Sequence, residues 1–113
     1  MSDPLPLRHF VWTTVFERTA RGLLAEDEIL ALEETLPRNP LSGATEDHAG
    51  GARKVRVALV GGGKSGGARV LYFYASHRDT IYLLLAFGKA VQASLTASQR
   101  KLLQRMVRRL ESP

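Results

Sequence analysis

The 113 residues are enough for one domain with a modest hydrophobic core, which we expect to span residues 1–113 with residues 1–9 as a leader. The absence of cysteine excludes disulfides and thiolate metal sites. Because no secretion signal and no apolar run of roughly 20 residues is found, we expect a cytoplasmic protein outside the membrane. The net charge of +5 is divided unevenly: residues 1–52 hold four basic and nine acidic residues, and residues 53–113 hold twelve basic and two acidic ones. This split favours a polyanionic partner for one surface.

The first half of the chain predicts one strand and one longer helix. Phe10 to Phe16 is rich in aromatic and β-branched residues, which is typical of a strand, and residues 17–24 have the mixed character of one or two helical turns. Apolar residues recur at helical spacing from Ala25 to Leu36, and the acids of the first turn suit the helix dipole, although Ala25 is a poor N-cap. Pro37 ends this helix.

The second half predicts three strands and a closing helix, over residues 54–60, 69–75, 81–87 and 98–110. The third of these strands is almost wholly apolar, so we expect it inside the sheet. Thr96 with Gln99 three residues later fits a capping box at the start of the last helix. The order of elements indicates an α+β domain, with an antiparallel β-sheet and helices packed on one of its faces.

A phosphate-loop-like pattern runs from Ala58 to Gly63, Lys64 and Ser65. That motif binds phosphates because the loop leads into the N-terminus of a helix. Here the following residues predict a strand, so we exclude a nucleotide hydrolase. Two interpretations of the glycine-rich segment stay open: a flexible hairpin tip, or a loop whose backbone N–H groups and Lys64 approach an anion.

Basic residues alternate with apolar ones along the strand that begins at Lys54. Side chains of a strand point to opposite faces in turn, so Lys54 and Arg56 share one face. If the next strand pairs with it as the apolar faces indicate, Arg69 joins them. Three cations on a rigid sheet predict a phosphate-binding site.

Taken together, these segments carry a family resemblance. The run GGARKVRVALVGGGKSGGARVLYFYA, then IYLLLAFGK and SLTASQRKLL, resembles the RelE/HigB-like toxins of bacterial type II toxin–antitoxin systems over roughly residues 10–110. The resemblance implies a RelE-like microbial RNase fold and metal-independent, cofactor-free cleavage of mRNA, usually in the ribosomal A site. It also implies a cognate antitoxin, typically a helix-turn-helix DNA-binding protein encoded next door.

Residue by residue, the resemblance assigns the catalytic positions. It places Lys54 and Arg56 at the paired basic positions of the strand, Arg69 at the scissile phosphate and Lys89 in the Gly-Lys that ends the last strand. Further candidates for RNA binding are Arg53, Lys64, Phe87, Arg100 and Lys101.

The chemistry is consistent with these residue types, because RNA carries its own nucleophile and the enzyme must only move protons and stabilise charge. Crowded like charges disfavour a protonated lysine, which makes Lys54 the expected base. Arg69 suits the phosphate, and the proton donor is Arg56 or Lys89. Phe87 could stack a base, although apolar strands favour core packing for it and for the tyrosines. The three histidines show no spacing typical of a nuclease pair or a metal site, so we expect all of them on the surface: His9, His48 and His77.

Two other functions fit the same scaffold. One is a ParE-like toxin that binds a protein target, a class without the paired strand cations. The other is a non-catalytic RNA-binding module, for which the basic last helix would be enough. Both predict that no RNA is cut, whereas the combination of Lys54, Arg56 and Arg69 favours a nuclease.

Overall fold

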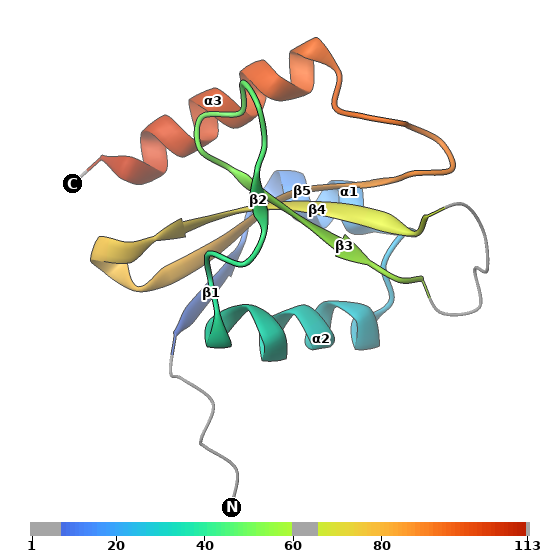
Figure 1. The fold of residues 1–113 in the computed structure, drawn as a ribbon, viewed down its shortest axis with the longest axis horizontal. Helices are drawn as coiled ribbons and strands as arrows, with labels where there is room; N and C mark the ends of the chain where they lie inside the picture. The colour runs from blue at the N-terminus through green and yellow to red at the C-terminus, as the bar shows by residue number, and fades with distance from the viewer. Residues whose placement is uncertain (1–7, 60–65, 113) are drawn as a thin grey trace, which may run out of the picture.

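The computed structural model describes residues 8–59 and 66–112 (Figure 1). A five-stranded sheet in the order β1-β5-β4-β3-β2 lies between helix α3 on one side and helix α2 on the other. The elements are β1 (His9–Trp12), α1 (Thr14–Ala20), α2 (Glu26–Thr35), a 3-10 turn η1 (Leu36–Arg38), β2 (Ala44–Thr45), β3 (Arg53–Val57), β4 (Ala68–Ala75), a 3-10 turn η2 (Ser76–Arg78), β5 (Thr80–Gly88) and α3 (Ala97–Glu111).

The predicted α+β class is confirmed, with two corrections to its details. Strands β3, β4 and β5 are antiparallel as expected, but β1 pairs with β5 in parallel, so the sheet is mixed. The helices cover both faces and not one. The reason is that β4 and β5 are apolar on both sides: Val70 and Leu83 belong to the core under α2, whereas Leu71 and Leu85 belong to the core under α3. A sheet with two apolar faces needs a helix on each.

The predicted strand over residues 10–16 is correct only in its first half. The chain leaves the sheet at Thr13, whose Oγ1 accepts a hydrogen bond from the N–H of Phe16 at 3.1 Å and so caps α1. The same hydroxyl donates to the carbonyl of Leu83 at 2.9 Å, which ties the cap to β5. A local cap with a tertiary anchor therefore outweighs the β-propensity of this segment.

Helix α1 lies along the edge of β5 that the short strand β1 leaves uncovered. Thr19 Oγ1 accepts from the backbone N–H of Ala86 at 3.0 Å. Phe16 and Ala20 pack into the core on the α2 side, while Val15 contacts the core on the α3 side. This edge of the sheet is thereby closed by a helix and not by a strand.

The ends of the two larger helices follow from their side chains. At the start of α2, Glu28 Oε1 accepts from the N–H of Ala25 at 2.7 Å, which compensates for an alanine that has no capping oxygen. The predicted capping box of α3 is confirmed, because Thr96 Oγ1 accepts from the N–H of Gln99 at 3.1 Å and Gln99 Oε1 accepts from the N–H of Thr96 at 2.9 Å. Within the residues described, none of the helices α1, α2 and α3 is long and apolar enough to span a bilayer.

Candidate active site

The strands bring three of the predicted cations to one face of the sheet. Arg56 lies opposite Arg69 in the β3–β4 register, and Arg69 lies opposite Phe87 in the β4–β5 register. Side chains of directly opposed residues share a face, and Lys54 shares it because it is two residues from Arg56. The apolar members of this face pack under α3. The predicted placement of Lys54 and Arg69 on the same side of the sheet is thus confirmed.

Gly66 is the point around which one group of cations gathers, which we call the Gly66 cluster: Arg56, Arg69 and Lys89. Arg69 Nη1 donates to the carbonyl of Gly66 at 2.6 Å. A Cβ on Gly66 would lie 3.5 Å from Arg56 Nη2 and 3.6 Å from Lys89 Cβ, so both side chains pass close to this glycine. Gly66 and Gly67 both have positive φ, 80° and 64°, a conformation that favours glycine and lets the chain turn tightly into β4.

The other cations of this face share an acid, and we call them the Glu46 cluster: Lys54, Arg100 and Glu46. Lys54 Nζ lies 3.0 Å from Glu46 Oε2, and Arg100 Nη1 lies 3.3 Å from Glu46 Oε1. The Glu46 side chain is 12% exposed, against 37% for Lys54. The sequence predicted that Lys54 is surrounded by other cations. In the structure it instead forms an ion pair with the Glu46 carboxylate.

The loop between β2 and β3 fixes Glu46 in place beneath α3. The carbonyl of Asp47 accepts from Arg100, and the carbonyl of His48 accepts from Gln104 Nε2 at 2.8 Å. Ala49 in the same loop is fully buried. A Cβ on Gly50, whose φ is 72°, would lie only 3.0 Å from the Cα of Gln104, so glycine permits this close approach. The anion between the two cations is thus held by a packed segment.

Several other predicted site residues lie elsewhere. Arg53 is on the opposite face from Lys54, where its Nη1 donates to the carbonyls of Leu41 and Gly43 at 3.1 and 2.8 Å. Phe87 is on the expected face but only 6% exposed, so it packs in the core, the interpretation that the apolar strands favoured over stacking on a base. Lys64 lies outside the described residues.

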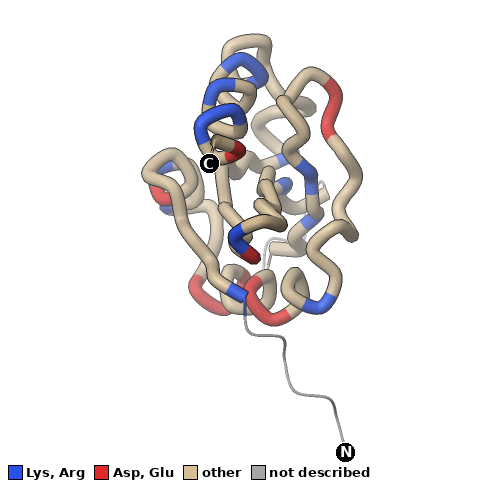
Figure 2. The backbone as a smooth tube through the Cα atoms, turned by 90° about the vertical axis from the view of Figure 1, so that its left-hand side faces the viewer, with Lys and Arg blue, Asp and Glu red and all other residues tan. Residues whose placement is uncertain are grey.

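The remaining predictions concern exposed residues and the tyrosines. Lys101 is exposed, as are other cations of α3, and the basic residues of this helix appear as blue segments in Figure 2. The three histidines are exposed, as expected. Core packing of Tyr72 is confirmed, because its ring is buried and its hydroxyl donates to the carbonyl of Pro40 and accepts from the N–H of Gly43, each at 2.9 Å.

Sequence reasoning missed Glu46. The available signal was its isolation, since Glu46 and Asp47 are the last acids before a segment in which only Asp79 and Glu111 are acidic. An acid at the entry to a strongly basic strand is a candidate counter-ion for that strand. The sequence alone gives no reason to choose Glu46 over Asp47, whose side chain is exposed.

A comparison with known families matches the chain, over residues 9–112, to the model described as the RelE toxin of the RelE / RelB toxin–antitoxin system. The match covers every described helix and strand, together with both cation clusters. The chain belongs to this family. It is accordingly a toxin of a toxin–antitoxin system, and its family implies a cognate antitoxin as a partner. RelE-family toxins are generally ribonucleases.

Proposed function

We propose that this RelE-family toxin is an mRNA endoribonuclease that acts on ribosome-bound mRNA in the cytoplasm and so arrests translation. The observation that carries the proposal is the Gly66 cluster. The side chains of Arg56, Arg69 and Lys89 pass close to one glycine, the Lys89 ammonium donates to the carbonyl of Ala93 at 2.6 Å, and none of the three forms an ion pair with an acid of residues 8–59 or 66–112. Their charge is therefore available to a phosphate.

In the proposed reaction the 2′-hydroxyl of the RNA attacks the adjacent phosphorus. A P–O2′ bond forms and the P–O5′ bond breaks, which leaves a 2′,3′-cyclic phosphate and a 5′-hydroxyl. Arg69 binds the phosphate oxygens, because a guanidinium forms two parallel hydrogen bonds and stays charged while negative charge develops. The proton needed by the leaving 5′-oxygen comes from Lys89 or Arg56, the other members of the Gly66 cluster.

The Lys54–Glu46 pair is the proposed acceptor of the 2′-hydroxyl proton. Lys54 Nζ lies 3.0 Å from Glu46 Oε2, so the base assigned to Lys54 from the sequence becomes a function of the pair. Glu46 accepts the proton, and Lys54 stabilises the developing alkoxide. Lys54 lies two residues from Arg56 along β3, about 7 Å away. The Lys54–Glu46 pair therefore lies one row of the sheet away from Arg56 and from Arg69, which is directly opposite Arg56.

The RNA-binding surface extends to α3 in this proposal. Arg100 lies beside Glu46, and exposed cations continue along the helix away from the sheet at Lys101, Arg105 and Arg108. These residues offer phosphate contacts that carry affinity without base recognition. The ribosome and its mRNA are the polyanions proposed to meet them. The proposed antitoxin is a helix-turn-helix DNA-binding protein encoded next to the toxin.

The test is an Arg69→Ala substitution assayed on ribosomes translating a defined mRNA, with cut sites mapped by primer extension. We expect cleavage to fall by roughly 100-fold to 1,000-fold, the loss found when one preorganised donor to a developing anion is removed. Arg38→Ala is the matched control, since Arg38 is exposed in η1 away from the sheet's cationic face. Cuts at the same sites and at the wild-type rate with Arg69→Ala would contradict the proposal, as would a wild-type protein that leaves every mRNA intact.

A further inference from the structure

Trp12, the one tryptophan of the chain, is held in place on two sides although it is 40% exposed. Its indole Nε1 donates to Glu33 Oε2 at 3.0 Å, and its ring meets that of Phe16 edge to face, with the centroids 5.8 Å apart. Trp12 shares a face of β1 with Phe10, which packs against the core under α2, so the indole lies on the side of the sheet opposite both cation clusters. A rigid, exposed tryptophan is typical of an interface anchor, because covering it buries a large surface at little cost in conformational entropy.

Two hollows flank the Trp12 indole. The first, of about 290 Å³, is lined by Trp12 and by α1 and extends to Leu24. The second, of about 300 Å³, is lined by Trp12 and by α2, and its wall includes Leu30, which is 52% exposed. Trp12 and Ile29 line both hollows, so the two adjoin at these side chains. The result is an exposed apolar centre on a part of the surface that the proposed cleavage site does not use.

Acidic side chains surround this apolar centre. Glu17 lines the first hollow, and Glu26, Asp27 and Glu33 line the second. Within residues 8–59 and 66–112 none of the four forms an ion pair, and Arg21 is the one base among the described residues that line either hollow. We call this region the Trp12 surface, and it consists of Trp12, Leu30, Glu17, Glu26, Asp27 and Glu33.

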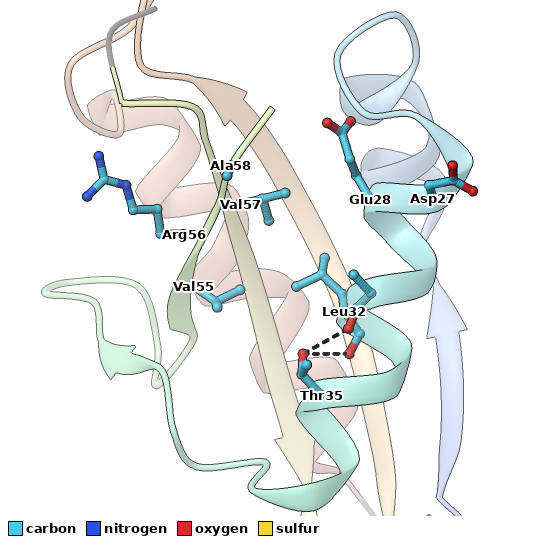
Figure 3. A pocket seen from close by; sticks show the side chains of 9 residues that line it. Asp27, Glu28, Leu32, Thr35, Val55, Arg56, Val57 and Ala58 are labelled. Carbon is cyan, nitrogen blue, oxygen red and sulfur yellow. Dashed lines mark hydrogen bonds between the residues drawn. The ribbon is translucent and has the colours of Figure 1, made fainter. Parts of the chain in front are cut away.

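The direction of the Asp27 side chain shows on which side of α2 its charge is presented. Asp27 also borders a mainly apolar groove of about 330 Å³ between α2 and β3. Figure 3 shows that its carboxylate is directed away from Val55 and Val57 of that groove, whereas Leu32 is directed toward them. The charge of Asp27 is therefore presented on the outer side of α2, away from β3.

The chemistry of the Trp12 surface selects a cationic and planar partner group. Carboxylates without a paired cation repel the phosphates of a nucleic acid and the acids of another protein. An arginine side chain matches both parts of the surface, because its guanidinium stacks on an indole while its N–H groups donate to carboxylates. Its aliphatic stem would cover Leu30. A lysine fits less well, since its ammonium is compact, strongly hydrated and not planar.

We propose that the Trp12 surface docks a basic segment of a ribosomal protein, with an arginine of that segment stacked on the Trp12 indole. The ribosomal source rests on the proposed function, because a toxin seated on the ribosome meets rRNA, which repels this surface, and basic protein segments, which it attracts. The cation clusters and α3 then face RNA, while the opposite face of the toxin holds protein. Two contacts of opposite charge on opposite faces favour one orientation of the toxin on the ribosome.

The first experiment uses Trp12 as its own reporter, since the chain holds no other tryptophan. The purified toxin is titrated with a short synthetic peptide that alternates arginine and leucine, and the tryptophan emission is followed. We expect a saturable change that weakens with added salt, and an affinity about threefold lower for the matching peptide of lysine and leucine. An emission that does not respond to the arginine peptide, or that responds equally to a peptide of glutamate and leucine, would overturn the proposal.

The second experiment asks whether a positive charge at this surface weakens or strengthens ribosome binding. Glu26→Lys and Glu34→Lys make the same charge change on α2, but Glu34 is exposed and lines neither hollow, so its variant is the matched control. Binding to purified ribosomes free of mRNA is measured by co-sedimentation, so that no substrate is cut. We expect Glu26→Lys to weaken binding by roughly tenfold or more, because like charges then meet at the interface, and Glu34→Lys to stay within about twofold of wild type. Circular dichroism and thermal unfolding verify that both variants fold.

The sign of the change separates the possible surroundings, because a surface that faces rRNA would bind more tightly after Glu26→Lys. Tighter binding, or binding equal to wild type, would overturn the docking alone if ribosome-bound mRNA is still cut. A wild-type toxin that neither sediments with ribosomes nor cuts mRNA would reject the proposed function and, with it, the ribosomal partner. If the toxin alone sediments as an oligomer that Glu26→Lys dissociates, the occupant is the basic α3 of a second copy, and the ribosomal assignment is wrong.

The third experiment identifies the class of the partner by photo-crosslinking. Benzoylphenylalanine replaces Leu30 in the second hollow or, as a control, the exposed Lys101 on α3, and each toxin is irradiated on the ribosome. We expect position 30 to crosslink to a ribosomal protein and position 101 to rRNA. A crosslink from position 30 to rRNA, or no crosslink from it, would contradict the docking of a protein segment.

Discussion

The two cation clusters differ in what holds their positive side chains. In the Gly66 cluster, Arg69 donates to the backbone carbonyls of Gly66 and Ala68, which are neutral acceptors that leave its charge uncompensated. In the Glu46 cluster, a carboxylate that is largely buried sits between Lys54 and Arg100. Both clusters lie on the face of the sheet that packs under α3, one row of residues apart.

The difference indicates a division of labour. Carbonyl partners orient a guanidinium without cancelling its field, so the Gly66 cluster is arranged to attract and hold a phosphate. A carboxylate partner cancels much of the field of a lysine but adds a proton acceptor, so the Glu46 cluster is arranged for proton transfer.

After Arg69→Ala, the largest effect is expected from Glu46→Gln, which removes the carboxylate charge and keeps the shape of the side chain. Cleavage should fall by about 100-fold, within the range measured for loss of a general base. RNA binding should instead become roughly threefold to tenfold tighter and more salt-dependent, because Lys54 and Arg100 are released for phosphates. Stability should also fall, because a largely buried carboxylate is lost from between Lys54 and Arg100. The measurements are single-turnover cleavage and binding titrations at several salt concentrations.

The matched control for Glu46→Gln is Asp47→Asn, which removes an exposed acid at the next position. It should leave both cleavage and the salt dependence of binding close to wild type. If Glu46→Gln cleaves at the wild-type rate, Glu46 only anchors the loop beneath α3, and the proposed proton acceptor must be abandoned.

A smaller effect is expected from Arg56→Ala in the uncompensated cluster. Cleavage should fall by roughly tenfold to 100-fold, less than for Arg69, because the Arg56 side chain is more exposed and its field is better screened.

Arg53→Ala is a stringent comparison three positions earlier on the opposite face. That variant should cleave normally and lose about 1–2 kcal/mol of unfolding free energy, since Arg53 donates to two loop carbonyls. If Arg53→Ala loses as much cleavage activity as Arg56→Ala, then the face of the sheet on which an arginine lies does not determine its role in cleavage.

Much of the fold could be predicted because its signals are local. The apolar runs located β4 and β5 to within one or two residues, and the Thr96 capping box located α3. The segment after Trp12 could not be predicted, because its helix depends on Thr13 reaching the carbonyl of Leu83, a contact between residues seventy positions apart. The parallel pairing of β1 and the use of both sheet faces depend on the same long-range packing.

For the site, strand alternation was sufficient to place Lys54 and Arg56 together, and the hairpin added Arg69. The alternation of the strand places Arg53 on the other face, so its predicted RNA contact is separate from the site of Lys54 and Arg56. The position of Glu46 could not be foreseen, since it depends on how the loop from Glu46 to Ala52 packs beneath α3. That packing needs the left-handed backbone of Gly50 and contacts with a helix about fifty residues away.

The smallest effect is expected from Thr96→Ala, which weakens the start of the helix that carries Arg100. Removing the hydroxyl leaves the N–H of Gln99 without its capping oxygen and should lower the free energy of unfolding by about 1 kcal/mol in urea titrations. Thr35→Ala serves as its control, because that hydroxyl donates only to carbonyls of its own helix, those of Ala31 and Leu32, and its loss should be nearly neutral. Cleavage by Thr96→Ala should stay within about twofold of wild type, since Arg100 is also held by Glu46 and by the carbonyl of Asp47. A cleavage defect as large as that of Glu46→Gln would show that the two cation clusters are not independent, and that the order of α3 controls both.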